Sequence, residues 1–228
     1  MYNGITDVFF DLDHTLWDFE KNSALTFEKI FKENGMQIAL PDFLKVYVPL
    51  NLKFWRLYRE EKLTKSELRY QRLKTAFDEI ELPVSDIQIN QLASDYITHL
   101  SSFNNLFPGT IGLLDYLKTK YRLHIITNGF EEIQEKKMKN ANILSYFDVV
   151  VNSEMAGVKK PNPKIFEMAL DKACIPAERA LMIGDSFEAD ILGAKNVGFQ
   201  VLHFNPDIGE PHEICPIVTD LNEIKDFL

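Results

Sequence analysis

The sequence predicts an α/β protein with a doubly wound parallel sheet, interrupted by an inserted all-helical domain. Three observations support this prediction. Short apolar runs without alternation recur along the chain, as expected for parallel strands buried on both faces. Helical patterns separate most of these runs, which is typical of doubly wound sheets. Residues from about 20 to 100 contain no strand-like run.

The predicted strands are short segments rich in Val, Ile and Phe. The first of them lies near the N-terminus, and the other four follow the long helical stretch. Their lengths suit buried strands rather than helices. The five segments are Asp7–Leu12, Leu123–Thr127, Asp148–Asn152, Ala180–Asp185 and Phe199–Phe204.

Helical patterns lie between these strands. Residues Glu131–Asn140 contain Glu132 and Lys136, and also Glu135 and Lys139, as pairs four residues apart. Such pairs stabilise exposed helices, so we expect this helix to lie on the surface. Three other segments have an apolar face or a helical pattern: residues 111–117, with Ile111, Leu114, Tyr116 and Leu117 on one face, Pro163–Ala173 and Ala189–Val197.

The early insertion is predicted to be entirely helical. Apolar residues from Phe43 to Tyr58 fall at helical spacing, although Pro49 is expected to kink or divide this segment. Thr64-Lys65-Ser66-Glu67 and Ser85-Asp86-Ile87-Gln88 are capping boxes that each begin a further helix. We therefore expect an α/β domain of residues 1–18 and 103–228, and a helical domain of residues 19–102.

Composition excludes several classes of protein. The net charge of −9 and the lack of a basic stripe argue against nucleic acid polymers as partners. No apolar run is long enough to span a bilayer, and the N-terminus lacks a signal-peptide pattern. We therefore expect a cytoplasmic protein, as a monomer or small homo-oligomer, with Cys174 and Cys215 as free thiols. A small phosphorylated metabolite is compatible with this charge.

Polar residues follow four of the predicted strands. Because ligands bind beyond the carboxyl ends of parallel strands, these residues are expected to converge. Each group alone also has an ordinary structural interpretation, such as a solvated loop, a turn or a helix N-cap at Ser186. Their occurrence at successive strand ends favours a site. The groups are Asp11, Asp13 and Thr15; Thr127-Asn128-Gly129; Lys159-Lys160-Pro161; and Gly184-Asp185-Ser186 with Asp190.

The residue types indicate phosphate chemistry. Several aspartates can hold Mg²⁺, which takes one or two carboxylates and a substrate phosphate. A carboxylate is also a competent nucleophile that forms an aspartyl-phosphate. A threonine hydroxyl and backbone N–H groups can hold phosphate oxygens, and a lysine neutralises the accumulated charge. Gly129 and Gly184 are expected to allow close backbone approach.

The four groups together resemble, in order, the four motifs of the haloacid dehalogenase-like (HAD) hydrolase superfamily. The helical insertion after the first motif is similar to the helical cap of that superfamily, and the resemblance extends over nearly the whole chain. Within the superfamily, the chain looks like the pyrimidine 5′-nucleotidases of the YjjG type. The segments that carry this closer resemblance are residues 126–130, 188–193 and 51–55.

The resemblance implies roles for the core residues. Asp11 would be the nucleophile and a Mg²⁺ ligand. Asp13 would act first as general acid and then as general base, and its backbone carbonyl would bind the metal. Asp185 would be the third protein ligand of the metal. Lys160, which directly precedes a proline, would be the motif lysine, with Lys159 a solvated neighbour.

The remaining assignments concern substrate and support. The resemblance implies that Thr127 and Asn128 bind the phosphate together with Lys160, and that Asp190 supports the metal or the lysine from behind. Asn51, in the helical insertion, is a candidate for reading a nucleotide base.

The second aspartate distinguishes the reactions of this superfamily. Halide needs no proton when it leaves, whereas an alcohol does, so Asp13 favours phosphate ester hydrolysis. We expect a Mg²⁺-dependent phosphomonoesterase, acting on nucleoside 5′-monophosphates with a preference for pyrimidines. A phosphosugar phosphatase or phosphomutase is the alternative within the superfamily. A non-catalytic phosphate-binding regulatory protein is the alternative outside enzymes.

Overall fold

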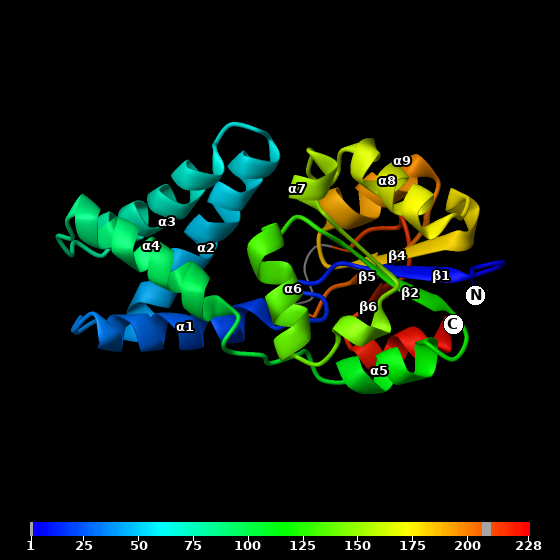
Figure 1. The fold of residues 1–228 in the computed structure, drawn as a ribbon, viewed down its shortest axis with the longest axis horizontal. Helices are drawn as coiled ribbons and strands as arrows, with labels where there is room; N and C mark the ends of the chain where they lie inside the picture. Colours follow the sequence, from blue (N-terminus) through cyan, green and yellow to red (C-terminus); the bar gives the residue numbers. More distant parts are fainter. Residues whose placement is uncertain (1, 207–210) are drawn as a thin grey trace. The chain divides into compact units, whose positions relative to one another are not determined.

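The computed structural model describes residues 2–206 and 211–228. The chain divides into two compact units (Figure 1). One is an α/β unit of Met1–Phe19 and Asn104–Leu228, and the other is a helical unit of Glu20–Phe103. Among the described residues, no helix has the length and apolar character needed to cross a membrane.

The α/β unit contains a six-stranded sheet in which every neighbouring pair is parallel. The spatial order is β3-β2-β1-β4-β5-β6, which confirms the doubly wound parallel fold. Five strands match the predicted segments, whereas the two-residue β6 is too short to show a pattern. Their bounds are β1 Asp7–Phe10, β2 Arg122–Thr127, β3 Val149–Asn152, β4 Ala180–Gly184, β5 Gln200–Phe204 and β6 Ile217–Val218.

The central strand β1 determines where the polar strand ends meet. Phe10 is in register with Ile125 of β2 and Ile183 of β4. The chain therefore leaves all three strands at the same edge of the sheet. All four residues of β1 are buried, because its two neighbours and the covering layers leave it no exposed face.

Helices cover the sheet on both sides, with α8 and α9 on one face and α5 on the other (Figure 1). Phe9 of β1, Met182 of β4 and Phe166 of α8 belong to one buried cluster beneath α8 and α9. The helices are α5 Thr110–Leu117, α6 Glu131–Asn140, α7 Ser153–Ala156, α8 Pro163–Ala173 and α9 Gly193–Val197, with short helical segments η1 Leu144–Tyr146, η2 Ala177–Arg179, η3 Phe187–Leu192 and η4 Leu221–Asp226.

Two helices of this unit differ from the prediction. The segment predicted as one helix over Ala189–Val197 begins earlier, as a π-helix (η3), and continues as α9. Ser186 caps η3, since its hydroxyl accepts a hydrogen bond from the backbone N–H of Ala189 at 3.2 Å. The helix α6 has the Glu135–Lys139 ion pair on its surface, but it also buries Gln134 and Lys137.

The helical unit consists of α1 Phe19–Glu33, α2 Leu40–Arg59, α3 Lys65–Glu79 and α4 Asp86–Leu100. Both capping boxes are confirmed, at Thr64 before α3 and at Ser85 before α4. Pro49 was expected to kink or divide its segment; it does not divide it, because α2 is continuous through this residue. Buried residues on both sides of Pro49, among them Tyr47 and Phe54, hold the two halves of α2 against one core and offset the missing N–H donor.

Candidate active site

The loop after β1 places Asp11 and Asp13. The backbone N–H of Asp11 donates to the carbonyl of Ile183 at 2.9 Å, so Asp11 still lies on the sheet. The chain then turns sharply, since the N–H of Trp17 donates to the carbonyl of Leu12 at 2.8 Å. Trp17 is fully buried and anchors the far side of this loop. The loop therefore holds the two aspartates on a rigid base.

Lys160 joins several strand ends through its buried ammonium group. Its Nζ lies 2.7 Å from Asp11 Oδ1, 2.7 Å from Asp190 Oδ1 and 2.6 Å from the carbonyl oxygen of Ile126. The contacts to Asp11 and Ile126 are hydrogen bonds, and the contact to Asp190 is an ion pair. Burial alone would lower the pKa of Lys160, but the carboxylates of Asp11 and Asp190 outweigh that effect and raise it, so the side chain is charged.

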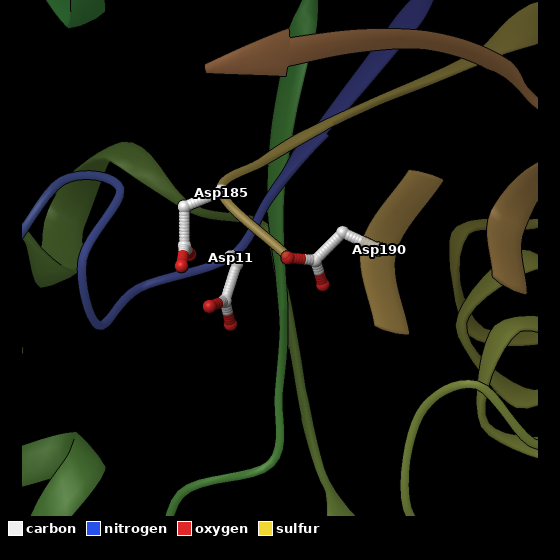
Figure 2. A group of neighbouring side chains, drawn as sticks. All are labelled: Asp11, Asp185 and Asp190. Carbon is white, nitrogen blue, oxygen red and sulfur yellow. The ribbon is translucent and has the colours of Figure 1, made fainter. Parts of the chain in front are cut away.

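Three carboxyl groups gather at the carboxyl end of the sheet (Figure 2). One oxygen from each of Asp11, Asp185 and Asp190 lies within 4.8 Å of the others. Thr15 donates to Asp185 Oδ1 at 3.1 Å, and the backbone N–H of Ser186 donates to Asp190 Oδ2 at 3.0 Å. The other oxygen of Asp190 forms an ion pair with Lys160, so both oxygens of this carboxylate contact protein groups.

Gly184 makes room for this arrangement. A Cβ atom at position 184 would lie 2.4 Å from Asp190 Oδ2, closer than any side chain tolerates. The close approach expected at Gly184 therefore exists, and it is made by a carboxylate of the same chain.

The carboxylates are held in unfavourable surroundings for negative charge. Burial raises the pKa of Asp11 to about 6, opposed by Lys160 and reinforced by Asp190. Burial and the charge of Asp11 raise the pKa of Asp185 to about 7. Two neighbouring acids destabilise each other's ionised form unless a cation compensates them. Lys160 supplies one positive charge to this cluster.

The donor set fits a hard divalent cation. All candidate ligand atoms are carboxylate oxygens, which Mg²⁺ and Ca²⁺ prefer. Asp11 and Asp185 project from adjacent strands β1 and β4, so one ion could bind both. A second positive charge there would relieve the repulsion that raises the pKa of Asp185.

The turn after β2 holds Thr127 and Asn128. The Asn128 side chain brackets the backbone of Lys160: its Nδ2 donates to the Lys160 carbonyl at 3.0 Å, and its Oδ1 accepts from the Lys160 N–H at 2.7 Å. Thr127 Oγ1 accepts from the N–H of Gly129 at 3.1 Å. The turn is therefore tied to the lysine loop, and Asn128 holds the backbone of Lys160.

Asp13 is bound by two residues of α6 that the sequence analysis did not select. Lys137 Nζ lies 2.5 Å from Asp13 Oδ1, and Gln134 Nε2 donates to Asp13 Oδ2 at 3.0 Å. The sequence offers no signal that separates them from the exposed polar residues of α6, because both are polar residues on a highly charged helix.

Asn51 lies in the helical unit and is engaged there. It is 2% exposed, and its Oδ1 accepts from Arg72 Nη1 at 2.9 Å and from the Tyr47 hydroxyl at 3.4 Å. Arg72 also stacks over the ring of Tyr96. Asn51 thus supplies a hydrogen-bond partner to a buried guanidinium group, which is a structural task. Its role toward substrate stays a prediction.

The raised pKa values lead to a prediction about stability. An acid with a raised pKa in the folded state binds more protons folded than unfolded, so stability falls as pH rises. In EDTA, the free energy of unfolding should therefore decrease between about pH 4 and about pH 7, the window set by Asp11 and Asp185. Urea unfolding of wild type and Asp185→Asn across this range measures the effect. The variant should show a flatter profile, whereas Asp171→Asn, on the exposed surface of α8, should follow the wild type.

Comparison with known proteins places the chain in a family. The sequence profile of the "Haloacid dehalogenase-like hydrolase" family matches residues 8–204. "Pyrimidine 5'-nucleotidase YjjG" of Escherichia coli (strain K12) is 31% identical over 97% of this chain and 96% of that protein. "Pyrimidine 5'-nucleotidase PynA" of Streptococcus pneumoniae is 31% identical over 96% and 92%, respectively.

Other relatives have different names. A "Glyceraldehyde 3-phosphate phosphatase" of Methanothermobacter thermautotrophicus is 32% identical over 97% of this chain and 98% of that protein. Among solved structures, the putative HAD-hydrolase YfnB from Bacillus subtilis, bound to magnesium, has a TM-score of 0.88 and 26% identity, covering 98% of both chains. The matched motifs and the shared fold establish that this chain belongs to the haloacid dehalogenase-like hydrolase family.

Proposed function

We propose that the protein is a Mg²⁺-dependent phosphomonoesterase that works through an aspartyl-phosphate on Asp11. The observation that carries this proposal is the contact between Lys160 and Asp11 within the carboxylate cluster. A lysine there keeps the nucleophile ionised and oriented, and it neutralises charge as a phosphate dianion approaches. Relatives named as phosphatases and nucleotidases support the same chemistry.

The first half of the reaction begins with attack. A carboxylate oxygen of Asp11 would attack phosphorus while the bond from phosphorus to the ester oxygen breaks. Mg²⁺ bound by Asp11, Asp185 and the Asp13 carbonyl would supply charge neutralisation for the phosphate and the nucleophile. Thr127, the N–H groups of its turn and Lys160 would hold the phosphate oxygens, while Asp190 holds Lys160.

Proton transfer would fall to Asp13. In the first step its carboxylic acid would give a proton to the departing alcohol oxygen. In the second, the resulting carboxylate would take a proton from the water that attacks the aspartyl-phosphate, which restores both aspartates and releases phosphate. Because halide departs without a proton, Asp13 supports ester hydrolysis over dehalogenation.

For the substrate, we propose a nucleoside 5′-monophosphate, with pyrimidines preferred. Two relatives that align over nearly the whole chain are named pyrimidine 5′-nucleotidases. A phosphosugar phosphatase is the second candidate, favoured by a relative named for glyceraldehyde 3-phosphate. We propose that the helical unit acts as the cap that selects between them, with Asn51 as a candidate determinant.

Replacement of the nucleophile should abolish turnover and preserve the fold. Asp11→Asn keeps the size of the side chain, and Asp190 remains as a charged partner of the buried Lys160, so the protein should still fold. Hydrolysis of p-nitrophenyl phosphate should fall by a factor on the order of 10⁴ or more, as for other essential nucleophiles. Asp171→Asn is the surface control, and substantial activity in Asp11→Asn would rule out Asp11 as the nucleophile.

Removal of the metal should abolish activity, and this loss should be fully reversible. EDTA should eliminate p-nitrophenyl phosphate hydrolysis, and added Mg²⁺ should restore it, because Asp11 and Asp185 need a compensating cation to bind a phosphate dianion. Mg²⁺ should also raise the melting temperature more at neutral than at acid pH, since the carboxylates must be ionised to bind it. Turnover that persists in EDTA would contradict the proposed metal site.

A panel of esters should separate the candidate substrates. Phosphate release from dUMP, dTMP, UMP and sugar phosphates, compared by kcat/KM, should be highest for a pyrimidine nucleotide. A preference for a sugar phosphate would transfer the assignment to the second candidate, and an isomerised product without phosphate release would indicate a phosphomutase. Absence of turnover on all of them and on p-nitrophenyl phosphate would favour a non-catalytic phosphate-binding protein.

A further inference from the structure

We propose that Lys137 and Gln134 of α6 are positioning residues for Asp13, needed for its proton transfer to alkoxide leaving groups. The inference rests on the proposed phosphomonoesterase function. It assigns a task to two buried polar residues that lie outside the four motifs. Changes to these two residues should therefore affect the hydrolysis rate of some esters more than others, depending on the leaving group.

Each oxygen of the Asp13 carboxylate accepts a hydrogen bond from one side chain of α6. Lys137 Nζ lies 2.5 Å from Oδ1, and Gln134 Nε2 lies 3.0 Å from Oδ2. Two donors from successive turns of one helix fix the plane of the carboxylate as well as its direction. An aspartate that must reach an ester oxygen and later a water needs such control, since general acid catalysis depends on hydrogen-bond geometry.

Lys137 is built into the interior of the α/β unit. Its side chain is only 3% exposed, and its ammonium lies 4.1 Å from the centroid of the Trp17 ring. A buried ammonium is costly unless charged and aromatic partners compensate it. Trp17 closes the loop that bears Asp13, so the lysine holds the loop and the carboxylate together. Lys139, two residues further along α6, is exposed and pairs with Glu135 on the surface of the same helix.

Gln134 connects the proton-transfer residue to the proposed phosphate loop. The same Nε2 that binds Asp13 lies 2.8 Å from Thr127 Oγ1. A Cβ atom at Gly129 would lie 2.1 Å from this nitrogen, so the glycine of the turn is required for Gln134 to occupy its place. The Gln134 amide therefore fixes the position of Asp13 relative to Thr127, which would hold the phosphate.

Both contacts are made by N–H donors on one helix, and together they hold the Asp13 carboxyl group in one orientation. Proton transfer to the departing oxygen depends on this orientation. Loss of Lys137 should therefore slow reactions that require this proton transfer. A nitrophenolate, which departs without protonation, should be affected little.

The test compares kcat/KM for two esters in wild type and Lys137→Met. This parameter covers the steps through departure of the alcohol, so it excludes slower hydrolysis of the aspartyl-phosphate, which both esters share. The alkyl ester is dUMP, with glycerol 2-phosphate as a second alkyl probe, and the activated ester is p-nitrophenyl phosphate. For the alkyl esters the value should fall about 10- to 100-fold, and for p-nitrophenyl phosphate it should change less than about threefold.

Matched variants separate a positioning role from a general loss of charge or of structure. Lys139→Met, on the exposed side of α6, should resemble the wild type on every ester. Lys137→Arg, which keeps a cation, should recover part of the alkyl ester activity. Gln134→Met should show the same selectivity as Lys137→Met, and it carries the test if the latter does not fold. Asp13→Asn gives the upper limit of the selective loss.

The outcomes distinguish this inference from the function on which it rests. If the wild type hydrolyses none of the esters, the proposed function has failed. If it hydrolyses them and Lys137→Met slows the alkyl and activated esters equally while melting normally, or slows neither, the positioning role is overturned and the phosphatase assignment stands.

Discussion

The ion pairs of Lys160 are the constraint on which the rest of the site depends. One buried ammonium contacts Asp11 at the end of β1, Asp190 in η3 and the backbone of β2. Buried carboxylates at strand ends would otherwise oppose folding, and a buried lysine without them would do the same. Each group is tolerated because the others are present, which couples the strand ends into one structure.

The neighbouring groups serve this arrangement. Asn128 holds the backbone of Lys160 on both its N–H and its carbonyl, and Gly184 leaves the space that the Asp190 carboxylate fills. Burial, reinforced by the neighbouring carboxylates and opposed by Lys160, raises the pKa values of Asp11 and Asp185. The proposed Mg²⁺ ion would offset this negative charge.

The two units contain different groups and have different proposed roles. The α/β unit contains the groups proposed for phosphoryl and proton transfer, with Asp13 oriented by α6. The helical unit has its own aromatic core, in which Phe43 contacts Phe27, Phe31 and Phe77, and its own buried polar contact between Asn51 and Arg72. In our proposal this unit would select the substrate, and its residues lie outside the four motifs.

The sequence by itself determined the parallel sheet, both capping boxes and the residues at the strand ends, because apolar periodicity and local hydrogen bonding act over a few neighbouring residues. Tertiary structure decided the rest. Continuity of α2 through Pro49 depends on packing on both sides of it, and the two-residue β6 exists only because β5 offers an edge. Lys137 reads as one more lysine on a charged helix, and only the fold brings it to Asp13, 124 positions away in the chain. Contacts at such separation depend on how the elements pack, which no local pattern in the sequence specifies.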